Sequence, residues 1–374
     1  MRVKLTGMLI CIALLAGLLS SCASYKHNQA TGFSISEVRN KLITESQIVK
    51  QAPFAERRFA PYLGGKWIGQ AASYGCYRNN QAPGAEGPSI PQILEDLNII
   101  KQYWSMVRVY NADGDTQRIL EVINENDIPL KVVLGIWLGK EEDSPETKQS
   151  NINNVLRGIE LCNQYPDIVN AVIVGNETQV FWTGHKLKTE SLIRYIRVVR
   201  NHTSVPVTTA DDYNFWNKPE SKALADEVDF IVTHIYPLWN GKTLDNAIGW
   251  LDETYNDVAK THPKKILVLG EIGWATRYNQ DKKGDGEQGS LIKGEVSLKA
   301  QGEFLLALDA WIFKNKVVTF LFEVFDEPWK GGGEASGTNE IEKNWGVFYV
   351  DRSPKSSFVN YLAKKETNRL IINH

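Results

Sequence analysis

The sequence predicts an α/β chain that folds as a single (β/α)8 TIM barrel, and three observations lead to this expectation. From residue 66 onward, short runs of β-branched and aromatic residues alternate with amphipathic helical patterns. Most of these runs are apolar at every position, which is typical of parallel strands buried on both faces. The alternation occurs eight times over roughly 300 residues, as a barrel of this kind requires.

Each strand is predicted from one apolar run that is bounded by polar or turn residues. In chain order the expected strands are Trp67–Tyr74, Met106–Tyr110, Leu130–Trp137, Asn170–Val174, Val205–Thr209, Phe230–Tyr236, Ile266–Gly270 and Val317–Phe325. Apolar residues at three- to four-residue spacing predict helices within 89–104, 152–162, 192–199, 244–258 and 298–312. Ser89 is the expected N-cap of the first helix.

An open, doubly wound sheet is the competing α/β architecture. Such a sheet is expected to carry a glycine-rich phosphate-binding loop after its first strand, and the sequence has none. No repeat with a period of roughly 20–50 residues accompanies the alternation. One barrel without a second domain is therefore the expected architecture.

The N-terminus has the pattern of a lipoprotein signal peptide over residues 1–21. Arg2 and Lys4 precede the apolar run Leu9–Leu19, which is too short to span a bilayer. The small residues before Cys22 resemble the bacterial lipoprotein cleavage box, in which the cysteine carries the lipid. A plain secretory signal with an incidental cysteine is the alternative.

Two segments follow the signal peptide. The polar residues 22–60 are interpreted as the lipidated N-terminus and a tether, although Val38–Val49 has a helical pattern. The barrel domain is expected to span residues 61–366. Two thiols lie within this domain, Cys76 and Cys162, and both are expected to be buried, with a disulfide between them as the alternative.

Polar residues close several of the predicted strands, and in a (β/α)8 barrel these strand ends form the active site. Glu177 follows Asn176 after the fourth strand, and Glu271 follows the seventh. Two carboxylates that meet over a sugar are suited to cleaving a glycosidic bond, because one protonates the leaving oxygen while the other attacks or activates water. Taken singly, each glutamate is equally well explained as half of a buried ion pair.

Short motifs at these strand ends resemble glycoside hydrolase family 17, the β-1,3-glucanase family, in its bacterial branch. The segments that carry the resemblance, in the family's order, are Tyr74–Pro83, Met106–Tyr110, Val174–Glu177, Thr233–Gly241, Gly270–Trp274 and Phe325–Lys330. The plant members usually have Thr or Ser after the nucleophile and Pro after the tryptophan. This sequence has Ile272 and Ala275 there, which argues against a plant-type substrate preference.

The resemblance implies the retaining two-glutamate mechanism of the clan A barrels. It makes Glu177 the acid/base and Glu271 the nucleophile, and it implies that Asn176 hydrogen-bonds the sugar 2-hydroxyl. Glu271 must stay ionised, which requires hydrogen-bond donors beside it. The candidate donors at neighbouring strand ends are Tyr236, Arg108 and His234.

The remaining candidate substrate-binding residues are aromatic or polar side chains near the strand ends. Sugar C–H faces stack on aromatic rings, so aromatic residues in the loops are expected to form subsites. The candidates are Tyr74, Tyr110, Trp239 and Trp274, together with Glu327 and Lys330 as a supporting polar pair. Further tryptophans of the same loops are Trp137, Trp182, Trp329 and Trp345. For each tryptophan, packing in the core is the alternative.

No metal and no cofactor is expected, since the sequence has no zinc-binding, P-loop or dinucleotide motif. The acidic, glycine-rich stretch Asp281–Glu287 lacks the ligand spacing of a calcium loop. It is interpreted as a mobile loop at the cleft rim, and the stretch that begins at Gly331–Gly333 is interpreted as another loop on the same face.

The sequence therefore predicts a monomeric, lipid-anchored enzyme of the bacterial cell envelope that cleaves β-glucan with retention, namely an endo-β-1,3-glucanase. Transglycosylation between β-1,3-glucans and hydrolysis of another β-glucan linkage are the enzymatic alternatives. An inactive glycan-binding lipoprotein is the alternative from another class. The near balance of 42 basic and 44 acidic residues argues against a nucleic-acid partner.

Overall fold

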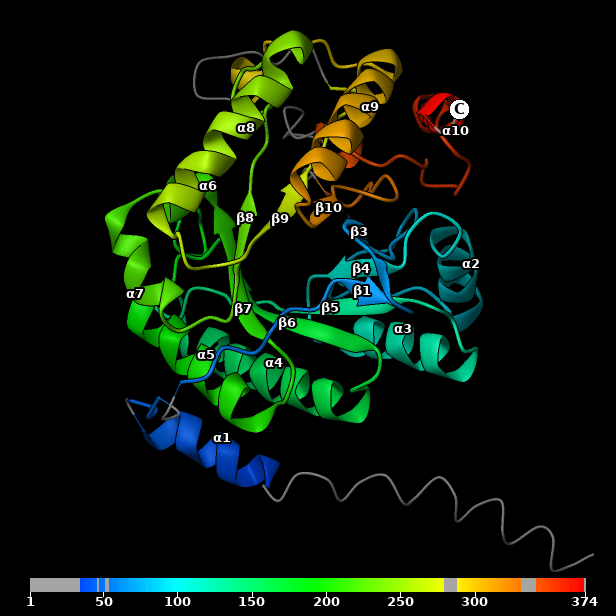
Figure 1. Cartoon of the computed structure of the whole chain (residues 1–374). Coiled ribbons are helices and arrows are strands. Elements are labelled where there is room, and N and C mark those ends of the chain that lie inside the picture. Colours follow the sequence, from blue (N-terminus) through cyan, green and yellow to red (C-terminus); the bar gives the residue numbers. More distant parts are fainter. Residues whose placement is uncertain (1–33, 46, 51–53, 279–287, 331–340, 373–374) are drawn as a thin grey trace, which may run out of the picture.

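The computed structural model contains a closed barrel of eight parallel strands with helices around it (Figure 1). It describes residues 34–45, 47–50, 54–278, 288–330 and 341–372. The signal peptide with Cys22, the loop Asp281–Glu287 and the glycines 331–333 lie outside the described residues.

Every barrel strand coincides with one of the predicted apolar runs, so the predicted (β/α)8 barrel is confirmed. Around the barrel the strands are β10 (Thr319–Leu321), β3 (Gln70–Ser73), β4 (Met106–Val109), β5 (Lys131–Ile136), β6 (Val169–Asn176), β7 (Val207–Asp212), β8 (Ile231–His234) and β9 (Leu267–Ile272). Neighbouring strands are parallel throughout. A small antiparallel ribbon precedes the barrel and consists of the strands β1 (Tyr62–Leu63) and β2 (Lys66–Trp67). Trp67, the first residue of the first predicted strand, belongs to this ribbon and not to the barrel.

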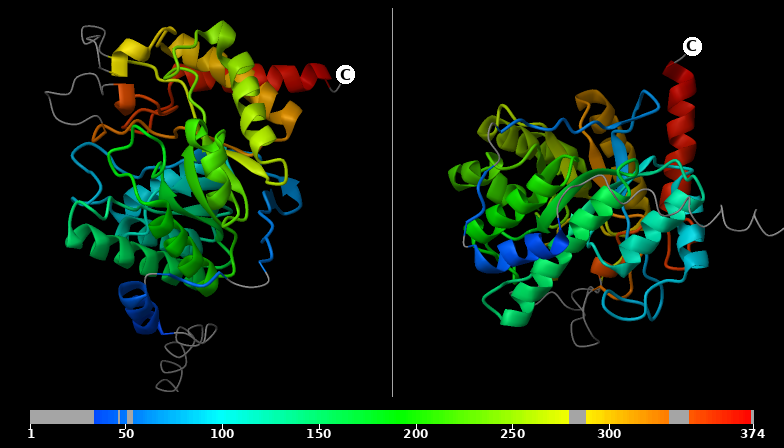
Figure 2. Two further views of the ribbon diagram at one scale, coloured as in Figure 1. Left: turned by 90° about the vertical axis from the view of Figure 1, so that its left-hand side faces the viewer. Right: turned by 90° about the horizontal axis from the view of Figure 1, so that it is seen from below.

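The helices cover the outside of the barrel, as the two further views in Figure 2 show. The long ones are α2 (Ile90–Ile100), α3 (Gly114–Glu125), α4 (Pro145–Gln164), α5 (Thr189–His202), α8 (Leu244–Thr261), α9 (Leu298–Asn315) and α10 (Ser356–Ile372). The short ones are α6 (Tyr213–Trp216), η1 (Pro219–Ser221), α7 (Lys222–Ala225) and η2 (Gln288–Leu291). Ser89 is the N-cap of α2, as predicted, and its backbone N–H donates to Gln92 (2.8 Å).

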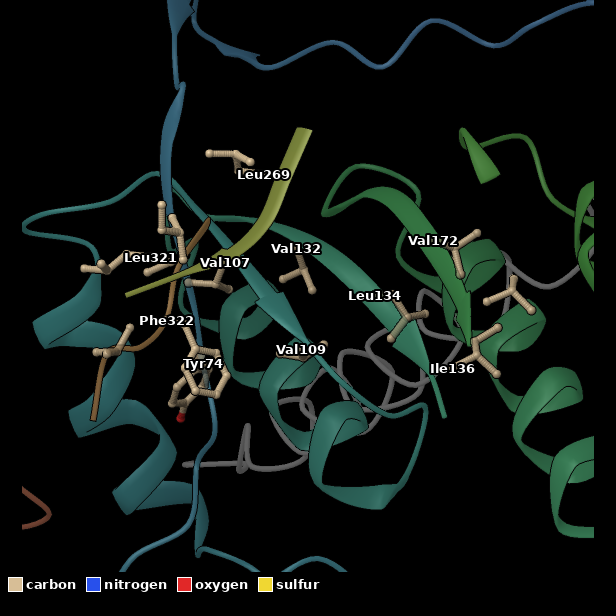
Figure 3. Close-up of a cluster of buried hydrophobic side chains, with 14 of the residues drawn as sticks. Tyr74, Val107, Val109, Val132, Leu134, Ile136, Val172, Leu269, Leu321 and Phe322 are labelled. Atoms are coloured by element: carbon tan, nitrogen blue, oxygen red, sulfur yellow. The ribbon is translucent and has the colours of Figure 1, made fainter. Parts of the chain in front are cut away.

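Most positions of the strands are apolar because both faces of the barrel wall are buried. Alternate side chains point outward and pack under the helices, a layer that Figure 3 shows with Val107, Val109, Val132 and Leu134 among its members. The side chains between them point into the barrel and fill its interior, as Met106 and Val133 do. A two-sided core of this kind leaves most polar side chains at the strand ends, with Arg108 in β4 and Thr208 and Thr209 in β7 as buried exceptions.

The described part of the N-terminal segment packs against the barrel, although the sequence indicated mainly a tether over residues 22–60. The helix α1 (Ile35–Thr44) begins after the N-cap Ser34 and buries Val38 and Leu42 on the side of α4. Three arginines spaced one turn apart on α5 then donate to backbone carbonyls of the segment, Arg194 to Leu42, Arg197 to Ile48 and Arg200 to Ala55. The described part of this segment therefore belongs to the folded body.

The same segment closes the bottom of the barrel. Phe59 belongs to the cluster that fills the barrel interior, and it stacks on Phe230 just before β8, with ring centroids 4.5 Å apart. Asn170, at the start of β6, donates to the carbonyl of the neighbouring Ala60 (3.4 Å). The floor beneath the strand-end site thus depends on a residue that precedes the first barrel strand.

Two smaller expectations concern cysteines and membranes. Cys76 and Cys162 are buried free thiols, as expected. Within the described residues, no helix combines the length and apolarity that crossing a bilayer requires.

Replacing Phe59 with alanine should lower the free energy of unfolding by about 3–5 kcal/mol, because it removes one of the two stacked rings and leaves a cavity. Chemical denaturation of the full chain measures this loss. Tyr62→Ala is the matched control on the same segment, and since Tyr62 is exposed, its loss should stay within about 0.5 kcal/mol. Equal losses in the two variants would contradict the role of Phe59 as the barrel floor.

Candidate active site

Glu271 lies in β9 at the mouth of the barrel and is almost fully buried. Its carboxylate accepts hydrogen bonds from Arg108 Nη1 (3.0 Å) and from the hydroxyl of Tyr236 (2.7 Å). Burial alone would raise the pKa of Glu271, but His234 and Arg108 hold this pKa below its ordinary value. Arg108, which comes from β4, therefore lies beside Glu271, the carboxylate that the family resemblance requires to stay ionised.

Glu177 follows directly on β6, where the strand loses its regular register. Gly175 has φ +80° and Glu177 has φ +48°, and the pairing with β7 shifts between Ile173 and Asn176. A positive φ is strained for a residue other than glycine and is often retained at functional sites. The backbone N–H of Glu177 still donates to the carbonyl of Ala210 (2.9 Å), which fixes the turn.

His234, at the end of β8, stands between the two glutamates. Its Nδ1 is 2.9 Å from Glu177 Oε1, and its Nε2 is 3.0 Å from Arg108 Nη1 and 3.5 Å from Glu271 Oε1. With one proton on Nδ1, the ring donates to Glu177 and accepts from Arg108. Burial alone would lower the pKa of His234, but the adjacent Glu271 and Glu177 hold it above its ordinary value. The imidazole thus lies between the two carboxylates and connects Glu177 to the Arg108–Glu271 pair.

Asn176 and Tyr110 complete the surroundings of the glutamates. Arg108 Nη2 donates to the amide oxygen of Asn176, which leaves the NH2 end of this side chain as the donor toward a ligand. The hydroxyl of Tyr110 donates to Ser73 (3.0 Å), and its ring lies beneath the guanidinium of Arg108 at 4.6 Å. Both residues border the cleft beside Glu271.

The cleft over the site has two lobes that meet at Glu271 and Phe322. The smaller lobe, about 440 Å³, is lined among others by Tyr77, Tyr110, Trp137, Asn176 and Trp329. The larger lobe, about 1180 Å³, is lined among others by Glu177, Phe181, Trp182, Tyr213, Trp239 and Glu342. Glu271 therefore faces both lobes, whereas Glu177 lines the larger one.

Glu327 and Lys330 form the expected polar pair at the edge of the smaller lobe. Lys330 Nζ is 2.5 Å from Glu327 and 2.6 Å from Glu323, and the indole of Trp329 donates to Glu327 (2.9 Å). Burial alone would lower the pKa of Lys330, but the two carboxylates raise it. Glu323 pairs with Lys330, whereas Arg108 pairs with Glu271.

Trp274 is not in the cleft, which corrects its prediction as a sugar-binding residue. Its side chain is only 1% exposed, packs on Phe304, and donates through Nε1 to the carbonyl of Glu295 (2.8 Å). The indole turns outward under α9 because the chain leaves the barrel wall directly after β9.

Two other aromatic candidates are also largely internal. Tyr74 is 2% exposed, and its hydroxyl donates to Asp96 (3.0 Å), so only its ring borders the smaller lobe; it lies in the buried cluster of Figure 3. Trp345 is buried beneath Tyr236 and Trp239. Trp239 itself lines the larger lobe, as a sugar-stacking residue must.

The structure brings three further carboxyl groups to the site. Burial raises the pKa values of Asp211 and Asp212, at the end of β7, to about 7, and it raises that of Glu342 to about 7 as well. Asp212 and Glu342 line the larger lobe. The two aspartates close an apolar strand and are therefore visible in the sequence as strand-end residues, whereas no strand-end signal marks Glu342.

The described residues include no group of three or more His, Cys, Asp or Glu side chains that is placed to hold a metal ion. The chemistry of the site therefore has to be argued from its carboxyl, imidazole, guanidinium and phenol groups.

Fungal relatives match most of the chain. The glucan endo-1,3-beta-glucosidase btgC of Emericella nidulans is 24% identical over 283 residues, which are 72% of this chain and 42% of the relative. The btgC protein of Aspergillus niger is 27% identical over 281 residues, again 72% of this chain and 40% of the relative. The chain thus spans less than half the length of these curated relatives.

Solved structures share the fold. An endo-laminarinase from Formosa superposes with a TM-score of 0.67 at 22% identity, over 79% of this chain and 87% of that one. A glycoside hydrolase family 17 β-1,3-glucanosyltransferase from Rhizomucor miehei gives 0.60 at 24% identity, over 77% and 95%.

The family match agrees with the resemblance to glycoside hydrolase family 17 that the motifs carry. Residues 71–346 match the family described as BtgE/BtgC glycoside hydrolase domain, and because this stretch is most of the chain, the chain belongs to that family.

Proposed function

We propose that the chain is a retaining glycoside hydrolase of β-glucan, with endo-β-1,3-glucanase activity as its main reaction. The observation that carries this proposal is the pair of strand-end glutamates joined through His234. Glu271 has Arg108 and Tyr236 as partners and is suited to act as an ionised nucleophile. Glu177 has no guanidinium or phenol partner among the described contacts and opens into the larger lobe, where it can reach the oxygen of a leaving group.

The comparisons support a β-1,3-glucan substrate. The fungal relatives are named glucan endo-1,3-beta-glucosidases. Among the fold relatives, one is an endo-laminarinase, and an active-site mutant of the Rhizomucor miehei transferase is described in complex with laminaritriose. Aromatic rings and convergent polar groups in both lobes of the cleft suit an oligosaccharide.

The proposed reaction proceeds in two displacements at the anomeric carbon. First, a Glu271 carboxylate oxygen bonds to this carbon while Glu177 donates its proton to the leaving glycosidic oxygen. Water then attacks the same carbon, its proton passes to Glu177, and the bond to Glu271 breaks. Asn176 is suited to hydrogen-bond the 2-hydroxyl of the reacting sugar, a bond that strengthens toward the oxocarbenium-like transition state.

Transglycosylation is the second candidate function. The observation that favours it is the glucanosyltransferase among the fold relatives. In that reaction a sugar hydroxyl takes the place of water in the second displacement. Both outcomes share the first displacement, so the two glutamates alone do not choose between them.

We also propose that the chain acts at the bacterial cell envelope as a monomer, anchored by a lipid on Cys22. The support for this is the pattern of residues 1–21 with small residues before the cysteine. Mass spectrometry of the protein from membranes tests the lipid on Cys22.

Product analysis of the full chain on laminarin, lichenan, linear β-1,6-glucan and cellulose tests the activity. We expect a ladder of short oligosaccharides from laminarin, whose new reducing ends appear first as the β-anomer in NMR spectra. Products longer than an oligosaccharide supplied as substrate would indicate the transferase. Binding of laminarin without any product would indicate the inactive glycan-binding alternative.

Replacing the two glutamates should have different effects if their roles are as proposed. Glu177→Ala should lower turnover of laminarin by about 10²–10⁴-fold but retain most turnover of an aryl β-glucoside, whose leaving group needs no proton. Glu271→Ala should abolish turnover of both substrates, because it removes the carboxylate that attacks the anomeric carbon in the proposed reaction. Glu190→Ala, on the exposed side of α5, is the control and should be neutral. Equal losses on both substrates in the two variants would contradict the assigned roles.

The hydroxyl of Tyr236 should set the acidic limb of the pH–rate profile. Tyr236→Phe removes a donor that keeps the pKa of Glu271 low, so Glu271 should lose its proton only at higher pH. The acidic limb of kcat/KM should therefore move up by roughly one pH unit. Tyr255→Phe, on α8, is the control with an unchanged profile. A fixed acidic limb in Tyr236→Phe would show that Glu271 ionisation does not govern it.

A further inference from the structure

The two lobes of the cleft differ in what they hold, an inference that rests on the proposed function. The acid must reach the glycosidic oxygen that leaves, so the leaving part of the glucan lies on the side of Glu177. Glu177 lines the larger lobe, whereas Asn176, suited to the reacting sugar, lines the smaller one. The larger lobe therefore holds the leaving group in the first displacement and an acceptor in the second.

Two aromatic rings stand exposed at the rim of this larger lobe. Phe181 is 72% exposed and Trp182 is 50% exposed, and their ring centroids are 4.8 Å apart in an edge-to-face arrangement. They lie only four and five residues after Glu177 and both line the lobe. Two adjacent, mostly exposed aromatic rings contribute little to the core, so their place in a cleft points to ligand contact.

The loop that carries these rings is fastened at both ends. The carboxylate of Asp211 accepts the backbone N–H groups of Gln179 (2.8 Å) and Val180 (3.1 Å). Leu187 N–H donates to the carbonyl of Thr178 (3.0 Å), and the Gln179 amide donates back to the Leu187 carbonyl (3.1 Å). The two ends of the loop are thus fixed. Less conformational entropy of the loop is therefore lost when a sugar binds to the two rings.

We propose that Phe181 and Trp182 form the acceptor platform of the cleft and set how the glycosyl-enzyme is divided between sugar and water. In the transfer step, the oxygen of an acceptor hydroxyl bonds to the anomeric carbon, and the bond from this carbon to Glu271 breaks. The hydroxyl proton passes to Glu177, which regains its acid form. A sugar stacked on the rings keeps its hydroxyl near the reacting carbon and displaces water from it.

The test uses the full chain with nitrophenyl β-laminaribioside as donor and laminaritriose as acceptor. Nitrophenol release counts all turnovers, and chromatography separates the longer transfer products from hydrolysis products. Phe181→Ala and Trp182→Ala should each lower the ratio of transfer to hydrolysis by about five- to tenfold. Trp182→Phe, which keeps a stacking face, should restore most of the ratio.

A matched control lies in the other lobe. Trp137 lies at the rim of the smaller lobe and, like Phe181 and Trp182, is an exposed aromatic residue, with 38% of its surface accessible. Trp137→Ala should leave the ratio within about twofold, because both routes start from the same glycosyl-enzyme. Ratios within twofold in both Phe181→Ala and Trp182→Ala would overturn the platform, as would a native chain without transfer product at any acceptor concentration.

A second measurement does not depend on turnover. Calorimetry of laminarihexaose binding to the Glu271→Gln chain should give a Kd about five- to tenfold higher when Trp182→Ala is added. An unchanged Kd would overturn the platform. A native chain that releases no nitrophenol but shows this loss of affinity would refute the proposed function and support the rings as a glycan-binding surface.

Discussion

The buried ion pair between Arg108 and Glu271 is the constraint on which the rest of the site depends. A carboxylate enclosed at the barrel mouth is costly to ionise unless a cation and further donors accompany it. The Arg108 guanidinium supplies more than charge, since it also donates to the carbonyl of Gly270 and to the amide oxygen of Asn176. One side chain from β4 therefore ties the ends of β6 and β9 together and sets the orientation of both glutamate-bearing segments.

Around that pair, burial and charge decide which carboxyl groups ionise. Burial raises the pKa values of Asp211, Asp212 and Glu342 to about 7, so a large share of these groups is protonated near neutral pH. Glu271 is equally enclosed but has His234 and Arg108 beside it, and its pKa is lowered. The site thus gathers many carboxyl groups yet directs its cations to Glu271, which keeps a strongly negative cleft from forming around this proposed nucleophile.

The sequence was sufficient for the barrel and for its polar strand ends, because both follow from a local pattern. A strand buried on both faces is apolar at each position, and the first polar residue marks where it leaves the wall. Contacts that join distant segments have no such pattern. Phe59 closes the barrel floor from a segment that looked like a tether, and Trp274 turns under α9 although it directly follows a strand end. Whether a loop aromatic faces the cleft depends on the path of the loop, which composition does not encode.

The division between strands and loops also explains why related barrels can differ in outcome while sharing carboxylates. Glu271 and Phe322 belong to both lobes, so the proposed nucleophile stands where the two lobes meet, whatever the surrounding loops contain. The rings of Phe181 and Trp182 sit on a loop whose base is fastened by Asp211, so these rings can change without moving Glu177. In the proposed function, strand ends therefore specify the chemistry and loops set the competition between water and sugar, so a barrel with one pair of glutamates can serve as hydrolase or transferase.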